Sequence, residues 1–318
     1  MRRRTFGLLA ASALAAPSLA HAAWPEKPVS VIVPYPPGGN NDILARLLAP
    51  VVEREIGQPL VIDNRGGGGG TIGAGAASRA PADGHTLLFA DIGILAIAPH
   101  LFARLPFDPD SFAPVVRLTE VSLLVGVPND SPHRTVGDLV AAARARPDAL
   151  NFGTPGPGTA GHLATQMLMS LSNTKMTHVP FRGSAPAAQE LVAGRIDLLI
   201  DGTLLPAVTQ GQVRALAVTG AHRSPFTPDL PTVAESGVPD YAFVSWHGVV
   251  APKGVPVEAV QKLNAAYNAA LRDPAVQDRA KQLGLPLAGG SAAEFTDWIQ
   301  KERAKFGPLV QASGARVE

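Results

Sequence analysis

The sequence contains no cysteine, few aromatic residues and no long apolar run beyond its first residues. Without cysteine, the chain can form neither a disulfide nor a thiol nucleophile, and an oxidising compartment poses no risk to it. Its 27 basic residues nearly balance its 26 acidic ones, and no basic stripe remains once Arg2–Arg4 are set aside. Composition thus excludes a disulfide scaffold and predicts no nucleic-acid partner.

The first 22 residues have the pattern of a secretory signal peptide. Arg2–Arg4 form a basic start, Phe6–Leu19 form an apolar segment, and Ala20–Ala22 provide an A-x-A cleavage site. No apolar run of about 20 residues follows, so we do not expect a membrane-spanning chain. Arg3–Leu8 also fits a twin-arginine signal, although the pattern favours the Sec route. We therefore expect a periplasmic protein that begins at Ala23.

Short apolar runs alternate with helical stretches along the remaining chain. Val29–Val33, Leu60–Asp63 and Thr86–Ala90 are apolar on successive residues, which is typical of strands buried on both faces. A helix is expected over Asp42–Ile56, with a kink or break at Pro50. The alternation predicts an α/β fold built from right-handed βαβ units and parallel sheets.

A second α/β series follows the first, and no flexible linker separates them. We expect the chain to cross between two lobes near Thr119–Val125 and again near Ser245–Val250, and the helical tail from Val257 to pack back onto the first sheet. Such paired crossings form a hinge. The expected division is 1–22 as signal peptide, 23–124 plus 247–318 as the first lobe, and 125–246 as the second.

Two glycine-rich turns, Pro34–Asp42 and Gly153–Thr159, each follow an apolar run and open a helical stretch. Backbone N–H groups at such a turn are unpaired, and the positive end of the helix dipole lies behind them. Asn41 or Asp42 is the expected cap of the first helix, and Thr159 can cap the second. Two such turns could hold both ends of one anion, which in an exported chain favours a solute receptor.

A third glycine-rich segment, Gly66–Gly70 with Gly73, contains the pattern G-x-G-x-x-G, and Asp91 lies downstream. This pattern is typical of dinucleotide-binding proteins. A run of five glycines matches such patterns by chance, however, and this run follows the second strand rather than the first. We therefore favour a close backbone crossing or a rim loop.

Three charged or titratable residues allow two interpretations each. His162, in the first turn of its helix, is either a packing residue or a ligand group. Arg182, in a strand-to-helix turn, pairs either with a ligand carboxylate or with a surface acid. Asp201, at the end of a strand, either accepts from a ligand N–H or caps the next helix.

Catalytic and metal-binding patterns are absent from the sequence. It contains no G-x-S-x-G, no H-E-x-x-H and no Walker A lysine, and no pair of its eight histidines has metal-ligand spacing. We therefore predict no catalytic residue, no metal and no cofactor.

The mature chain resembles the Bug-type extracytoplasmic solute receptors of tripartite tricarboxylate transporters over essentially its whole length. The matching segments are Trp24–Pro28, Pro34–Asp42, Asp63–Arg65, Ala80–Leu88, Gly153–Leu163, His178–Gly183, Arg214–Thr219, Leu230–Gly237 and Ala251–Gly254. The resemblance implies a type II periplasmic binding fold, in which two lobes joined by hinge strands close on a ligand in the cleft between them.

The resemblance also implies the function and the site. It implies a receptor that captures a small organic carboxylate, mostly through backbone amides, small hydroxyl groups and waters, and delivers it to integral-membrane permease subunits. The candidate ligand-binding residues are Tyr35, Pro37, Gly38, Gly39, Asn40, Asp42, Thr154, Gly156, Gly158, Thr159, His162, Arg182 and Asp201. An alternative is a ligand-sensing periplasmic subunit of a signalling system, and an exported α/β enzyme is a third, less favoured interpretation. The sequence does not identify which carboxylate is bound.

Overall fold

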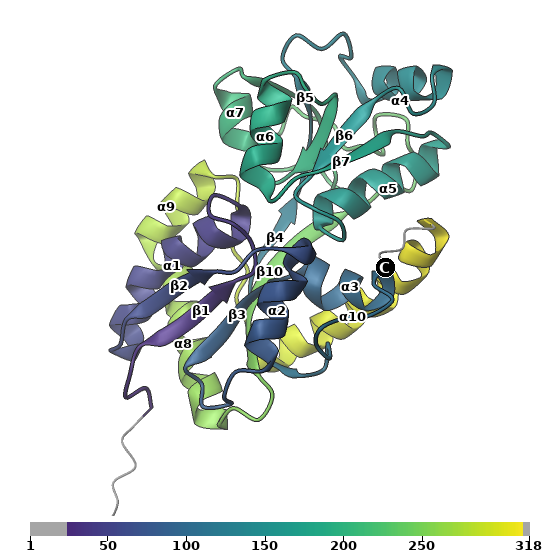
Figure 1. The fold of residues 1–318 in the computed structure, drawn as a ribbon. Helices are drawn as coiled ribbons and strands as arrows, with labels where there is room; N and C mark the ends of the chain where they lie inside the picture. The colour runs from purple at the N-terminus through teal and green to yellow at the C-terminus, as the bar shows by residue number, and fades with distance from the viewer. Residues whose placement is uncertain (1–23, 314–318) are drawn as a thin grey trace, which may run out of the picture.

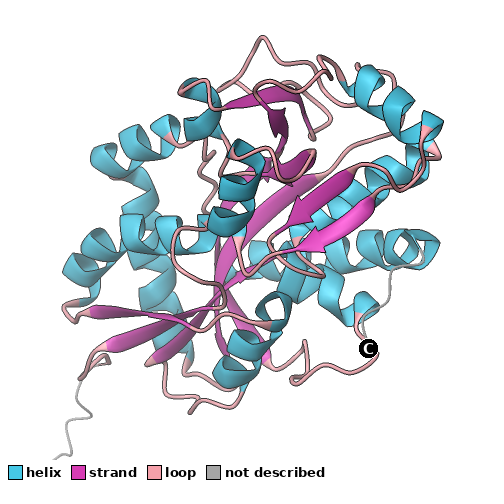
Figure 2. Ribbon diagram, turned by 45° about the horizontal axis from the view of Figure 1, so that its top comes forward, coloured by secondary structure: helices cyan, strands magenta, loops and turns pink. Residues whose placement is uncertain are grey.

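The computed structural model describes residues 24–313, so the expected signal peptide lies outside the described residues. The strands of this part of the chain form two five-stranded sheets, one in each of two lobes (Figure 1). Strands lie in the interior of the lobes and helices lie outside them (Figure 2). The predicted two-lobed α/β fold is confirmed.

The first sheet has the strand order β2-β1-β3-β10-β4. Its strands are β1 (Val29–Val33), β2 (Leu60–Asn64), β3 (Thr86–Asp91), β4 (Phe112–Ser122) and β10 (Val244–Pro252). β1 pairs in parallel with β2 and β3, whereas β10 runs antiparallel to β3 and β4. β1 is almost wholly buried, as its continuous apolar run predicts.

Helices cover both faces of the first sheet. α1 (Asn40–Ile56) packs against α8 (Val257–Arg272) on one face, and α2 (Thr71–Ser78) packs across β1 and β3 on the other. The remaining α-helices of this lobe are α3 (Ala98–Leu101), α9 (Pro274–Gln282) and α10 (Ala292–Ser313), and two short helices of other types are η1 (Gly68–Gly70) and η2 (Gly93–Ile97). The tail therefore returns to the first sheet, and α8 and α10 both contact β4.

α1 runs through Pro50 without the break that the sequence led us to expect. Pro50 lies on the exposed side of the helix, where water can bond the carbonyl group that loses its N–H partner. The buried face of α1, which includes Leu44, Leu48 and Val52, keeps the helix on the sheet.

The second sheet has the order β7-β6-β8-β5-β9. Its strands are β5 (Leu124–Pro128), β6 (Asn151–Thr154), β7 (Thr177–Pro180), β8 (Leu198–Asp201) and β9 (Val213–Val218). Its helices are α4 (Val136–Ala145), α5 (Ala160–Ser172), α6 (Ser184–Val192) and α7 (Leu205–Thr209). β6 is parallel to β7 and β8, and β5 is antiparallel to β8 and β9.

The expectation of parallel sheets is therefore wrong for one strand in each lobe. β10 and β5 are the strands that the chain enters directly after crossing from the other lobe. A strand that enters from the cleft side runs against the strands of βαβ units, which end at that side. The crossings thus explain the mixed sheets.

The two crossings lie side by side and pair with each other. Between β4 and β5 the chain passes through Leu123, whose N–H donates to Thr219 Oγ1 at 2.8 Å. Thr219 N in turn donates to Leu123 O at 3.0 Å, and Phe243 N donates to Thr219 O at 2.8 Å. Thr219 is fully buried, so this junction forms a compact hinge about which the lobes can bend.

β5 begins at Leu124 and β10 at Val244. The expected second crossing near Ser245–Val250 therefore falls within β10, and the chain returns to the first lobe earlier than we expected. The aromatic residues Tyr241 and Phe243, just before Val244, are also typical of a strand, so the start of β10 is hard to place from sequence. The lobe boundaries after residues 124 and 246 stay predictions.

Candidate functional site

A cavity of about 50 Å³ lies between the lobes, at the ends of strands from both sheets. The first lobe contributes the segment after β1, the end of β3 and the start of β10, and the second contributes the segments that follow β6 and β7 and the end of β8. We call it the inner cavity. Ligands of α/β proteins bind at the carboxyl ends of strands, and here two such ends face each other.

Two helices begin at the inner cavity without a side-chain cap. α1 starts after Gly39 and α5 starts after Thr159, and no side chain within residues 24–313 accepts from the first N–H groups of either helix. The Thr159 hydroxyl donates to Gly156 O at 2.7 Å instead. The expected capping by Asn41, Asp42 or Thr159 is therefore wrong. The uncapped N–H groups leave two positive helix ends beside one cavity.

Asp42 holds the turn before α1. Its Oδ2 accepts from Gly38 N at 3.0 Å, and its Oδ1 accepts from Arg46 Nε at 2.9 Å and from Asn64 Nδ2 at 3.0 Å. Gly38 has φ of 91°, a conformation that side chains disfavour. Asp42 thus lies behind the turn and fixes its shape.

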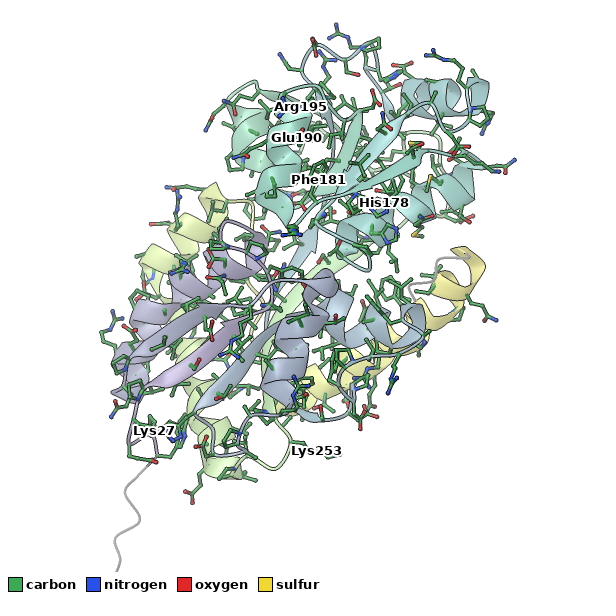
Figure 3. All side chains as sticks on the ribbon, viewed as in Figure 1. Lys27, His178, Phe181, Glu190, Arg195 and Lys253 are labelled. Carbon is green, nitrogen blue, oxygen red and sulfur yellow. The ribbon has the colours of Figure 1, made fainter. Side chains whose placement is uncertain are left out.

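His162 has the same role in the turn before α5. Its Nδ1 accepts from Gly158 N at 3.2 Å, and its ring stacks on His178 at 4.4 Å between ring centroids. Burial, with a smaller contribution from the neighbouring His178, lowers the pKa of His162 to about 4. His178 and Phe181 lie at the edge of the second lobe that faces the first (Figure 3). His162 is therefore neutral and orders the turn.

Thr154 supports the same turn from the end of β6. Its hydroxyl group bonds His178 Nε2 at 2.7 Å and accepts from Gly156 N at 3.2 Å, and its side chain is fully buried. Because these contacts are internal to the second lobe, Thr154 holds the turn and does not line the cavity.

Two buried acids line the inner cavity, one from each lobe. Asp91 accepts from Ile94 N at 3.1 Å and from Asn41 Nδ2 at 3.4 Å. Asp201 accepts from Ser184 Oγ at 2.9 Å and from the backbone N and hydroxyl of Thr203. Burial raises the pKa of both carboxyl groups. Among the described residues that line this cavity, none is lysine or arginine.

A larger outer cavity of about 770 Å³ adjoins the inner one, since Tyr35 and Pro155 line both. The glycine run Gly66–Gly70 forms part of its wall, and Arg182 of the second lobe also lines it. A side chain on Gly69 would place Cβ 2.1 Å from Pro157 O of the second lobe. The run therefore permits the two lobes to touch, as the expected close backbone crossing requires.

The structure places the predicted site residues in three groups. Those at the inner cavity are Tyr35, Gly39, Asn40, Thr159 and Asp201. Those at the outer cavity are Pro37, Gly156 and Arg182, again with Tyr35. Those that line neither cavity are Gly38, Asp42, Thr154, Gly158 and His162.

Sequence reasoning missed several residues that line the inner cavity, above all Asn41, Asp91, Ser184, Ser245 and His247. Asp91 ends β3, and the rule that ligands bind at strand ends could have found it. Ser245 and His247 lie on β10, which arrives from the second crossing, so no local pattern indicates them.

Within residues 24–313, no group of three or more histidine, aspartate or glutamate side chains is arranged to hold a metal ion. In the same residues, no helix has both the length and the apolar character needed to cross a membrane.

Comparison with known proteins assigns the chain to a family. Residues 44–315 match the tripartite tricarboxylate transporter family receptor. The chain is 31% identical to the protein BugT of Bordetella pertussis, over 98% of this chain and 96% of that protein. The chain therefore belongs to the tripartite tricarboxylate transporter receptors, and the Bug-type resemblance is confirmed.

Solved structures agree with the family. An R. palustris protein solved with adipate is 36% identical and superposes with a TM-score of 0.89, over 92% of this chain and 100% of that one. MatC from Rhodopseudomonas palustris with bound malate is 33% identical, with a TM-score of 0.87 over 90% and 100%. These likenesses confirm the periplasmic binding protein fold.

Proposed function

We propose that the protein is a periplasmic receptor that captures a small organic carboxylate between its lobes and delivers it to membrane permease subunits. The observation that carries this proposal is the meeting of two uncapped helix ends, those of α1 and α5, at one cavity between hinged lobes. The adipate and malate bound by the two similar structures support the same class of ligand.

The chemistry of the inner cavity suits a carboxylate. Each N–H group that donates to an anion contributes about 1.5–3 kcal/mol, part of which offsets desolvation. Gly39 precedes α1 and leaves the backbone there open to a ligand, whereas Gly161, in the first turn of α5, lets that helix approach Ile200 O of β8. Because α1 belongs to one lobe and α5 to the other, a ligand that bonds both helix ends stabilises the closed form.

Closure is also the signal that a permease can read. The lobes touch where Gly38 faces Ala185 and where Gly183 faces Pro36. These contacts exist only when the cleft is shut, so the closed form presents a surface that the open form lacks. We assign no chemical step to the protein, since its family is one of transporter receptors.

The test is calorimetric binding by the mature protein to mono- and dicarboxylates, with their uncharged amides as controls. We expect selective binding of the acids and a rise in melting temperature, since a ligand that binds only the native state stabilises it. Binding of the amides equal to that of the acids would contradict the proposal.

A matched pair of variants locates the site. A Cβ at Gly39 meets its nearest neighbour, Ser184 Oγ, at 3.9 Å, so Gly39→Ala is tolerated. Gly39→Val adds two further methyl groups to a cavity of about 50 Å³. We expect Gly39→Val to weaken carboxylate affinity at least tenfold and Gly39→Ala to weaken it far less, with similar melting temperatures. Equal affinities in both variants would place the ligand elsewhere.

A further inference from the structure

The charge of the inner cavity is unusual for an anion site. Asp91 ends β3 in the first lobe and Asp201 ends β8 in the second, and each residue is more than nine-tenths buried. All their hydrogen-bond partners among the described residues are neutral. Labelled lysines such as Lys27 and Lys253 lie at the far end of the first lobe (Figure 3). Among the described residues, two carboxyl groups and no lysine or arginine therefore line the closed cavity.

Burying a carboxylate without a counter-charge is costly, and the cost falls when a cation is placed beside it. The inner cavity therefore combines two kinds of surface. The starts of α1 and α5 supply N–H groups for an anion, whereas Asp91 and Asp201 supply acceptors for a cation or a strong donor. A ligand with charge of both signs matches both surfaces, whereas a second carboxylate in this cavity would lie against the two acids.

Two further side chains in the inner cavity have hydrogen-bonding atoms that are not used within the described part of the protein. Ser245 and His247 are more than nine-tenths buried and line the cavity from β10. His247 Nδ1 bonds Thr119 Oγ1 at 2.9 Å. Among the described residues, neither His247 Nε2 nor the Ser245 hydroxyl has a hydrogen-bond partner. Buried polar groups are normally paired, so these groups indicate a polar ligand.

We propose that the ligand carries an ammonium group beside its carboxylate, as an α-amino acid does, and that Asp91 and Asp201 bind that ammonium group in the closed cleft. The inference rests on the proposed function and narrows it. The size of the inner cavity, about 50 Å³, suits the small head of an amino acid, and any longer side chain extends into the outer cavity beside Arg182.

The experiment compares ligand pairs that differ only in the amino group. The pairs are alanine with propionate, aspartate with succinate, and glutamate with glutarate, each measured by calorimetry on the mature protein. We expect at least one amino member to bind ten times more tightly than its partner. Asp91→Asn keeps the shape of the side chain but removes its charge, so the preference should fall at least fivefold. Asp201→Asn is a second variant, and Asp229→Asn, which removes an exposed acid, should leave the preference unchanged.

Each other outcome overturns the inference in a distinguishable way. If the acids without an amino group bind equally or better, the ligand is not an amino acid, but the carboxylate receptor stands. If the binding of the acids without an amino group strengthens as the pH falls, Asp91 and Asp201 bind the ligand in their protonated form instead. If the amino preference persists in both cavity variants, the two acids do not bind the ammonium group. If no member of any pair binds, the proposed function fails as well.

Discussion

Single residues behind the cavity determine the shape of its walls. His162 lies behind the turn before α5, and Asp42 lies behind the turn before α1. Neither residue lines the inner cavity. Each one instead accepts a hydrogen bond from a glycine N–H and so fixes a turn whose other residues line the cavity. The sequence placed both residues near the ligand but could not distinguish contact with the ligand from support of the turn. That distinction depends on which way a side chain points, and local sequence does not specify it.

The buried imidazole of His162 makes stability depend on pH. Its pKa is about 4 in the folded protein and 6.5 when exposed, so its contribution to stability is complete above pH 6.5 and is lost as the pH falls toward 4. The loss is about 3 kcal/mol, at about 1.4 kcal/mol per pKa unit. His162→Asn keeps an acceptor for Gly158 N without the titration. We expect its free energy of unfolding, from denaturant titrations at several pH values, to fall less steeply in this range.

The comparison between variants isolates this histidine from other buried groups. The raised pKa values of Asp91 and Asp201 act in the opposite direction, because protonation of these acids favours the folded state as the pH falls. Both acids are present in the wild type and in His162→Asn, so their effect on stability cancels when the two pH profiles are compared. His222→Asn, at an exposed site, serves as the control. Parallel pH profiles for the wild type and His162→Asn would disprove the burial effect.

At the scale of elements, the pattern of strands and turns was largely predictable. Val29–Val33 and the two glycine-rich turns carry local signals, because buried parallel strands and tight turns constrain the residues at each position. β10 was harder to place, since its pairing with β3 and β4 depends on chain far away in sequence. The site residues that it carries, Ser245 and His247, were missed for the same reason.

The turn before α5 is also an interlobe contact. A Cβ on Gly158 would lie 2.9 Å from Leu101 Cδ2 and 3.1 Å from Phe102 Cε2, both in the first lobe. We therefore expect Gly158→Ala to hold the lobes apart and to weaken ligand affinity at least tenfold. Calorimetry measures the affinity. In the presence of ligand, small-angle scattering should show a larger radius of gyration for Gly158→Ala than for the wild type.

Gly57 provides a matched control for this substitution. Its φ of 77° is close to the 79° of Gly158, but a Cβ built there would meet no atom of the described residues within 4 Å apart from its chain neighbours. Gly57→Ala thus carries the same backbone strain, about 1 kcal/mol, without the clash. It should lower the melting temperature slightly and leave the affinity unchanged. A similar loss of affinity in both variants would mean that strain, and not closure, is responsible.

For the whole molecule, closure joins the hinge to the cavity. The hinge at Thr219 is buried and paired on both strands, so bending there moves each lobe as a unit. The closing contacts lie on the other side of the inner cavity, where Gly38 meets Ala185 and Gly69 meets Pro157. A ligand in the inner cavity therefore cannot leave unless these contacts separate.

A disulfide across the closing contacts tests that requirement directly. A Cβ on Gly38 would lie 3.4 Å from Ala185 Cβ, close to the 3.5–4.5 Å typical of a disulfide, and the chain has no cysteine to compete. In Gly38→Cys/Ala185→Cys, we expect ligand bound before oxidation to survive dialysis, and ligand added after oxidation to be excluded. Reduction of the disulfide should restore ligand exchange in both samples. Because the backbone strain at position 38 is present in the oxidised and in the reduced protein, a difference between them is due to the disulfide. Free exchange by the oxidised protein would show that ligand reaches the cavity without opening the lobes.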